Sequence, residues 1–189
     1  MNQGLFALTL SLAALGAAGC GSGVSSTDDA KQAYEGLDAS IDKAINLGFD
    51  GFNAASNANI PPQTANGMLK GKMTVSGKVD QGASDNKTMD LNEELVEYSD
   101  REKLVYDTKG ELPLISMKLS KVPDGTLDGT MKGTFTMSGD LEGPVTLDLT
   151  FTSDLQAGDG TKVVRKPGTT HIQGTATSDF GTFDVDVMR

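Results

Sequence analysis

Residues 127–151 read LDGTMKGTFTMSGDLEGPVTLDLTF, and this stretch decides the fold. Its odd-numbered positions carry apolar residues or glycine, while its even-numbered positions carry Asp, Thr, Lys, Ser or Glu, with Pro144 as the one exception. Successive side chains on a β-strand point to opposite faces of a sheet, so the alternation predicts strands with one buried face. The turn-forming residues 140–144 divide the stretch into the two strands of a hairpin, and Pro144 fits the first position of the second strand.

Similar alternation elsewhere predicts about eight antiparallel strands in all. It is present in five further groups, namely Met73, Val75 and Val79; Met89 and Leu91; Ile115, Met117 and Leu119; Ile172, Gly174 and Ala176; and Phe183, Val185 and Val187. Residues 71–80 (GKMTVSGKVD) also align with residues 133–142 (GTFTMSGDLE), which favours duplication of one β-meander unit. Residues 92–107 fit either a strand or a helix, and residues 57–66, which contain two prolines, predict a loop.

The segment before these strands predicts one amphipathic helix from about Asp28 to Leu47. Apolar residues recur there at three- and four-residue steps, and Asp28 and Asp29 place negative charge in the first helical turn. Residues 28–189 therefore predict a single α+β, mainly β, domain. We expect the N-terminal helix to pack on the concave side of a curved antiparallel sheet or partly closed barrel of about eight strands, because glycines at inward positions favour strong curvature.

The first residues of the chain differ sharply from the rest. Residues 1–19 contain no charged side chain, and a run of apolar and small residues from Leu5 to Leu15 leads into Gly-Ala-Ala-Gly. An apolar run of this length is too short to span a bilayer and is typical of a signal-peptide core. Cys20 follows directly and is the only cysteine in the 189 residues. Residues 17–20 (AAGC) resemble the lipobox of bacterial lipoproteins, in which small residues precede a cysteine that begins the mature chain.

This resemblance implies that residues 1–19 are removed and that Cys20 carries diacylglycerol on its sulfur and an acyl chain on its new amine. Two or more acyl chains give durable anchoring in a bilayer. Residues 20–27 would then form a lipidated, flexible tether. Ala17 stands where the family usually has Leu, and no Lys or Arg is present near Met1, so a start upstream of Met1 stays open. By the same resemblance, Gly21 stands where an inner-membrane retention signal in enteric bacteria would have Asp, which favours the outer membrane, if the cell has one.

The acidic composition excludes several classes of partner. The chain has 26 Asp and Glu against 16 Lys and Arg, a formal net charge of −10 and a pI near 4.4. Nucleic acid requires a basic face for its phosphates, and an acidic protein is repelled by anionic lipid when it lies flat on a membrane. We therefore expect no nucleic-acid partner, and attachment to a membrane through the N-terminal lipid.

The polar residues contain no catalytic, cofactor-binding or metal-binding motif, so we expect no cofactor and no metal. Alternation places His171, the one histidine, on the polar face of a strand, as is typical of a surface residue. Residues 80–86 (DQGASDN) offer oxygen ligands suited to calcium, but turn chemistry explains them as well. An acidic segment favours a solvated edge over the opposed carboxylate pair of a glycosidase. It comprises Glu93, Glu94, Glu97, Asp100 and Glu102.

The apolar face of the predicted sheet is rich in methionine. Methionine is flexible and glycine leaves room, so this face can form an ordinary core or line a cavity for an acyl chain beneath the helix. The candidate cavity residues are Met73, Met89, Met117, Met131, Phe135 and Met137.

Three functions follow, in order of support. The first is a non-catalytic, membrane-anchored envelope lipoprotein that acts as a structural or interaction module, with an envelope protein as its partner. The second is a carrier of lipid or another hydrophobic ligand between helix and sheet, for which similarity to the half-barrel lipid carriers of the bacterial envelope is an argument from fold alone. The third is a carboxylate-based hydrolase.

Overall fold

The computed structural model describes residues 26–80 and 82–189, which form two helices and ten strands. The helices are α1 (Ser26–Glu35) and α2 (Asp38–Ala54). The strands are β1 (Asn59–Asn66), β2 (Lys70–Val79), β3 (Lys87–Ser99), β4 (Leu104–Asp107), β5 (Leu114–Ser120), β6 (Thr126–Gly139), β7 (Gly143–Ala157), β8 (Val163–Arg165), β9 (His171–Ser178) and β10 (Gly181–Met188). The prediction of a mainly β fold with helix packed on a large antiparallel sheet is confirmed.

The strands form one sheet in the order β1-β2-β3-β4-β6-β7-β9-β10, and each pair is antiparallel. Both β4 and β5 lie between β3 and β6. The last part of β3 pairs with β4 and its first part pairs with β5, so these two strands occupy one place in the sheet, interrupted by residues 108–113. The short strand β8 pairs with the end of β7. The edges of the described sheet are therefore β1 and β10.

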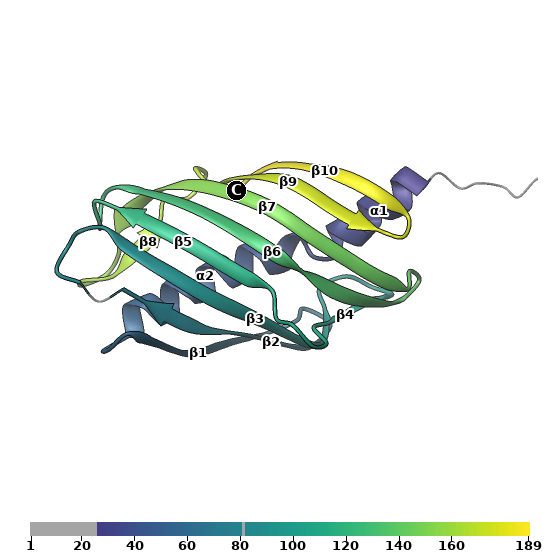
Figure 1. Ribbon diagram of the computed structural model, residues 1–189, viewed down its shortest axis with the longest axis horizontal. Helices are drawn as coiled ribbons and strands as arrows, with labels where there is room; N and C mark the ends of the chain where they lie inside the picture. Colours follow the sequence, from purple (N-terminus) through teal and green to yellow (C-terminus); the bar gives the residue numbers. More distant parts are fainter. Residues whose placement is uncertain (1–25, 81) are drawn as a thin grey trace, which may run out of the picture.

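Both helices lie on the same side of the sheet, behind the strands as drawn in Figure 1. The helix α2 packs on β1, β2 and β3, whereas α1 packs on β9 and β10. A single row of cross-strand neighbours crosses the sheet beneath them, and all its members other than the two glycines are buried. The row is Ile60, Gly77, Leu91, Ile115, Met131, Leu149, Gly174 and Val185.

The prediction of one helix over residues 28–47 is corrected to two helices separated by a break. At the break the Leu37 N–H donates to the Tyr34 carbonyl at 2.8 Å, which leaves the Ala33 carbonyl without its helical donor. The hydroxyl of Tyr106 on β4 donates to this carbonyl at 2.9 Å. A Cβ at Gly36 would lie 2.1 Å from the Tyr106 hydroxyl oxygen, so glycine is required there. A side chain from a distant strand thus ends α1, which local periodicity does not indicate.

The prediction of a loop over residues 57–66 is wrong, because β1 occupies most of it. The strand β1 lies at the edge of the sheet, and its register shifts between Ile60 and Gln63, around the two prolines. Proline has no N–H to donate, so it is tolerated in an edge strand at an irregularity, where no neighbouring strand needs that hydrogen bond. Residues 92–107, left open between strand and helix, form the end of β3, a turn and β4.

We predict that Tyr106→Phe destabilises the fold by about 1–3 kcal/mol, because the buried Ala33 carbonyl loses its donor. Urea denaturation followed by circular dichroism measures this free energy of unfolding. Tyr34→Phe is the matched control. Its hydroxyl donates to the Asp38 carboxylate at 2.7 Å in a partly exposed place where water can replace it, so the loss should be smaller. Equal losses in the two variants would contradict the role given to Tyr106.

Candidate functional site

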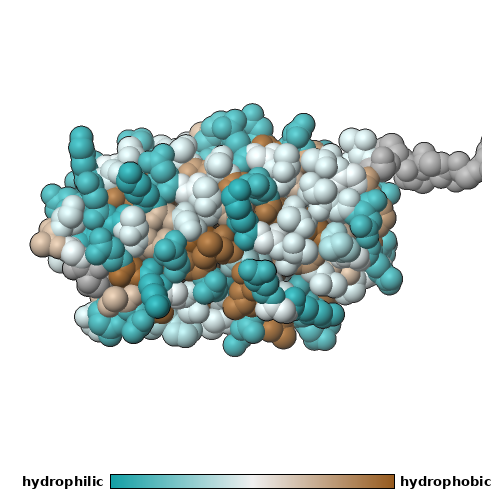
Figure 2. Space-filling model, viewed as in Figure 1, coloured by the Kyte–Doolittle hydropathy of each residue, from teal (hydrophilic) through white to brown (hydrophobic). Residues whose placement is uncertain are grey.

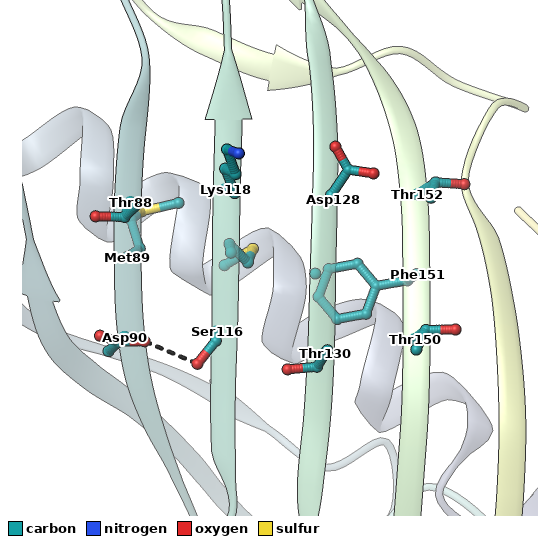
Figure 3. Close-up of a pocket in the computed structure, with 12 residues that line it drawn as sticks. Thr88, Met89, Asp90, Ser116, Lys118, Asp128, Thr130, Thr150, Phe151 and Thr152 are labelled. Carbon is teal, nitrogen blue, oxygen red and sulfur yellow. Dashed lines mark hydrogen bonds between the residues drawn. The ribbon is translucent and has the colours of Figure 1, made fainter. Parts of the chain in front are cut away.

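A hollow of about 610 Å³ lies over four neighbouring strands, β3, β5, β6 and β7. Figure 3 shows its polar side chains on the face of the sheet that is turned away from the helices. They belong to two cross-strand rows of outward-facing residues. These rows are Thr88, Lys118, Asp128 and Thr152, and Asp90, Ser116, Thr130 and Thr150.

The walls of the hollow combine hydroxyls with opposite charges. Ser116 donates a hydrogen bond to the Asp90 carboxylate at 2.7 Å, and Lys118 is the cross-strand neighbour of Asp128. The floor is apolar, because Met89, Met117 and Phe151 approach from the core side. Hydroxyls both donate and accept hydrogen bonds, so the hollow can bind a polar surface that also brings some apolar area.

The hydroxyl-rich character extends beyond the hollow across the outer face. One cross-strand row runs over β6, β7, β9 and β10 and consists of threonine alone: Thr134, Thr146, Thr177 and Thr182. The hydroxyl oxygens lie 2.8 Å apart in the first pair and 3.2 Å apart in the last. Figure 2 shows this face as mostly white and teal, with a brown area near its centre.

A second unusual feature lies on the opposite face of the sheet. Glu93 is fully buried, and neither oxygen of its carboxyl group has a hydrogen-bond partner among the residues that the structure describes. It is in phase with the inward-facing Leu91 and Leu95, and its cross-strand neighbour on β2 is Val75. Burial without a partner disfavours the charged form, and it raises the pKa of Glu93 to about 8. The group is therefore a neutral acid inside the core at neutral pH.

The structure separates the other carboxylates of the acidic segment. Glu94 faces outward, and Glu97 forms an exposed ion pair with Lys70 at 3.3 Å. Asp100 is almost buried, 3.1 Å from the Lys43 ammonium, and its carboxylate accepts hydrogen bonds from the Tyr98 hydroxyl and a backbone N–H. Glu102 is exposed in the turn before β4. These carboxylates do not face Glu93 across a common cleft.

The remaining polar candidates have ordinary surroundings. His171 lies on β9 as predicted, and its Nε2 is 2.5 Å from an Asp186 carboxylate oxygen on β10. Of residues 80–86, the described ones, 80 and 82–86, lie between β2 and β3, and the side chains of Asp80 and Ser84 accept backbone N–H groups there. Within residues 26–80 and 82–189, no three His, Cys, Asp or Glu side chains come together in a way that could hold a metal ion.

The candidate cavity residues all lie in one core cluster beneath the helices. Each is at most 2% exposed, and two of them, Met89 and Met117, also reach the floor of the outer hollow. Because side chains buried this far fit either a filled core or a closed cavity, the lipid cavity stays a prediction. Cys20 lies outside the residues that the structure describes.

Sequence reasoning did not single out Glu93 from its acidic neighbours, nor did it find the hollow. A usable signal for Glu93 was present, since residue 93 shares its odd-numbered phase with Met89, Leu91 and Leu95 on the apolar face. The hollow had no such signal, because its residues come from strands up to 64 positions apart, from Thr88 to Thr152. Only the register of the sheet brings them together.

Comparison with known protein families, curated proteins and solved structures finds no match for this chain. Of the helices in the described part of the chain, none has the length and apolar character needed to cross a membrane.

We predict that Glu93 makes the fold less stable as pH rises from about 5 to 8. The folded state keeps the Glu93 proton up to pH 8, whereas the unfolded state loses it near its ordinary pKa of 4.5. The unfolded state therefore binds fewer protons in this range, and the free energy of unfolding falls by up to about 1.4 kcal/mol per pH unit. Glu93→Gln cannot titrate, so urea denaturation at pH 5 to 8 should show that this contribution, about 2.5 kcal/mol between pH 5.5 and pH 7.5, has disappeared.

Glu94→Gln is the control for this experiment, because Glu94 is the exposed neighbour on the same strand. This variant should keep the pH dependence of the wild-type protein. If Glu93→Gln and the wild type lose stability with the same slope, the carboxyl group of Glu93 is not a buried neutral acid.

Proposed function

We propose that this chain is an exported lipoprotein, anchored in a membrane through Cys20, whose folded domain acts as a non-catalytic interaction module. The observation that carries the proposal is a lone cysteine directly after an apolar, uncharged leader that ends in small residues. Small side chains give a signal peptidase access to the backbone, and the thiol is the nucleophile that accepts the diacylglycerol. A single cysteine cannot form a disulfide within these 189 residues, so lipidation gives Cys20 a specific use.

The position of the domain relative to Cys20 supports this proposal. The helix α1 begins at Ser26, six residues after Cys20. Six extended residues reach about 20 Å at most, so the lipid would hold the domain beside the bilayer. The start of α1 lies at one end of the long axis of the domain, as Figure 1 shows. Anchoring at this end would leave the outer face of the sheet beside the membrane and accessible to a partner. Gly21 makes the outer membrane our proposed location where the cell has one.

We place the interaction surface on the outer face, at the hollow bounded by Thr130 and its neighbours. Threonine loses little side-chain freedom on binding because it is branched at Cβ. Regular strands also hold their side chains more firmly than loops, so a partner meets a surface that is already ordered. The proposed partner is another protein of the envelope.

The second candidate, a carrier of hydrophobic ligands, is favoured by one observation. The helix α2 packs on one edge strand of the sheet and α1 packs on the other. We infer that the sheet curves around the helices as a partly closed barrel, with the methionine-rich face inside. Flexible methionines could move aside for an acyl chain there. Acyl chains in organic extracts of the purified Cys20→Ser protein, which carries no lipid anchor of its own, would favour this function over the first.

We predict that Cys20→Ser releases the protein from the membrane fraction. The wild type should sediment with membranes and resist extraction by 1 M salt, because two or more acyl chains bind durably. Mass spectrometry of the wild-type N-terminal peptide should show that it begins at Cys20 and carries diacylglycerol and an acyl group. Cys20→Ser should lack both modifications and move to the soluble fraction.

Ala17→Ser is the matched control, because it keeps a small residue before the cleavage site and leaves Cys20 in place. This variant should still be processed and should remain in the membrane fraction. An unmodified Cys20 in the wild type, with residues 1–19 still attached, would contradict the proposed anchor.

We also predict that the outer hollow is covered by a partner in the cell. A photo-crosslinking residue in place of Thr130 should give one adduct of defined mass in intact cells. The same residue in place of Asp159, in the exposed turn between β7 and β8, is the control and should not give that adduct. Crosslinking to the same product from both positions, or from neither, would argue against an interaction surface at the hollow.

A further inference from the structure

The antiparallel sheet gathers four turns and the start of α1 at one end of the domain, which we call the anchor end. Its turns are residues 66–70, 99–104, 139–143 and 178–181, and register places them at the same level. Tyr34 on α1 stacks on Phe183 with ring centroids 5.4 Å apart, and Asp38, the first residue of α2, contacts Arg189, so this part of the chain runs in the same direction as β10. The first residue of α1 therefore lies near the turn between β9 and β10, towards the right-hand end of Figure 1.

The turn between β1 and β2 at the anchor end presents two apolar side chains to solvent. Met68 is 75% exposed and Leu69 is 57% exposed, which makes Met68 the most exposed large apolar residue of the described chain. Lys70 and Lys72 follow them and are also exposed. Adjacent apolar side chains at the tip of a hairpin, followed by lysines, suit the boundary between acyl chains and lipid headgroups.

The conformation of this turn is fixed by groups that do not depend on either apolar side chain. The Asp100 carboxylate accepts the Met68 N–H at 2.7 Å, and the same carboxylate is held by Lys43 at 3.1 Å. The Leu69 N–H donates to the Ser99 carbonyl at 3.0 Å. These bonds hold the tip in place with its two apolar side chains directed into solvent.

Two glycines are required for the same turn. A Cβ at Gly67 would lie 2.1 Å from the Lys70 carbonyl oxygen. Gly71 has a φ of +72°, a left-handed conformation that other residues adopt only with strain. Glycines and a partly buried ion pair therefore maintain an exposed apolar tip, although exposing apolar surface is unfavourable in water. A partner that removes this surface from water would offset that cost.

We propose that Met68 and Leu69 insert into the bilayer that holds Cys20, so that the domain is attached to the membrane at two points. This inference rests on the proposed lipid anchor for the identity of the bilayer. The tether from Cys20 to α1 ends at the same end of the domain as the tip, and it is short enough to bring that end to the membrane surface. A tether alone leaves the domain free to rotate, whereas the inserted tip fixes its orientation and turns the outer hollow to the side.

The test places an environment-sensitive fluorophore at the tip. The fluorophore is attached to Leu69→Cys in the full chain. The sulfur of Cys20 carries lipid, so the introduced thiol is the only one that can react with the fluorophore. The labelled protein is then incorporated into vesicles of phosphatidylcholine and phosphatidylglycerol. Asp159→Cys, in an exposed turn at the opposite end of the sheet, is the control. Doxyl-labelled lipid should quench the label at 69 at least about threefold more than the label at 159, because quenching requires contact with acyl chains. Equal quenching at both positions would overturn the proposal.

A second arm separates the tip from the anchor. The full chain with Cys20→Ser is compared with the same chain carrying Met68→Ser and Leu69→Ser, and partition onto the vesicles is measured by sedimentation. Loss of two apolar side chains should weaken partition about tenfold or more. Equal partition overturns the insertion of the tip even if Cys20 proves to be lipidated. A tenfold difference supports insertion of the tip even if Cys20 proves to be unmodified. In that case the proposed lipid anchor is wrong, and the insertion of Met68 and Leu69 still stands.

Discussion

The burial of one apolar sheet face against α1 and α2 is the constraint on which the rest of this structure depends. A continuous row of inward side chains runs from Ile60 at one edge to Val185 at the other, through every long strand of the sheet. The chain has one cysteine, so no internal disulfide can supplement this core. Apolar burial contributes roughly 25 cal/mol per Å², and it must offset the entropy of ordering more than 160 residues.

Two polar residues enter this core with different consequences. The hydroxyl of Tyr106 replaces a helical hydrogen bond and thereby determines where α1 ends. The carboxyl group of Glu93 has no hydrogen-bond partner within residues 26–80 and 82–189, and a pKa near 8 keeps it neutral at neutral pH. In natural proteins few buried polar groups lack a hydrogen-bond partner, and those that do often lie at strained or functional sites. Glu93 therefore makes the stability of the core depend on pH.

The two faces of the sheet and the anchor end have distinct properties. The inner face forms the buried core beneath the helices, the outer face carries rows of hydroxyls around a shallow hollow, and the anchor end presents Met68 and Leu69. If the anchor end meets the bilayer, the outer face stands beside the membrane and the opposite end points away from it. The anchor, the apolar tip and the proposed interaction surface are then compatible with one orientation.

The sequence by itself determined the class of fold, because a period of two over residues 127–151 is compatible only with half-buried strands. It also determined the hairpin at residues 140–144 and the inward direction of the methionines, since both follow from local spacing. The break after α1, the edge strand through Pro61 and Pro62, and the single place shared by β4 and β5 depended on residues distant in sequence. Tertiary structure alone decided the hollow and the anchor end, because each is assembled by strand register from segments that have no relation along the chain.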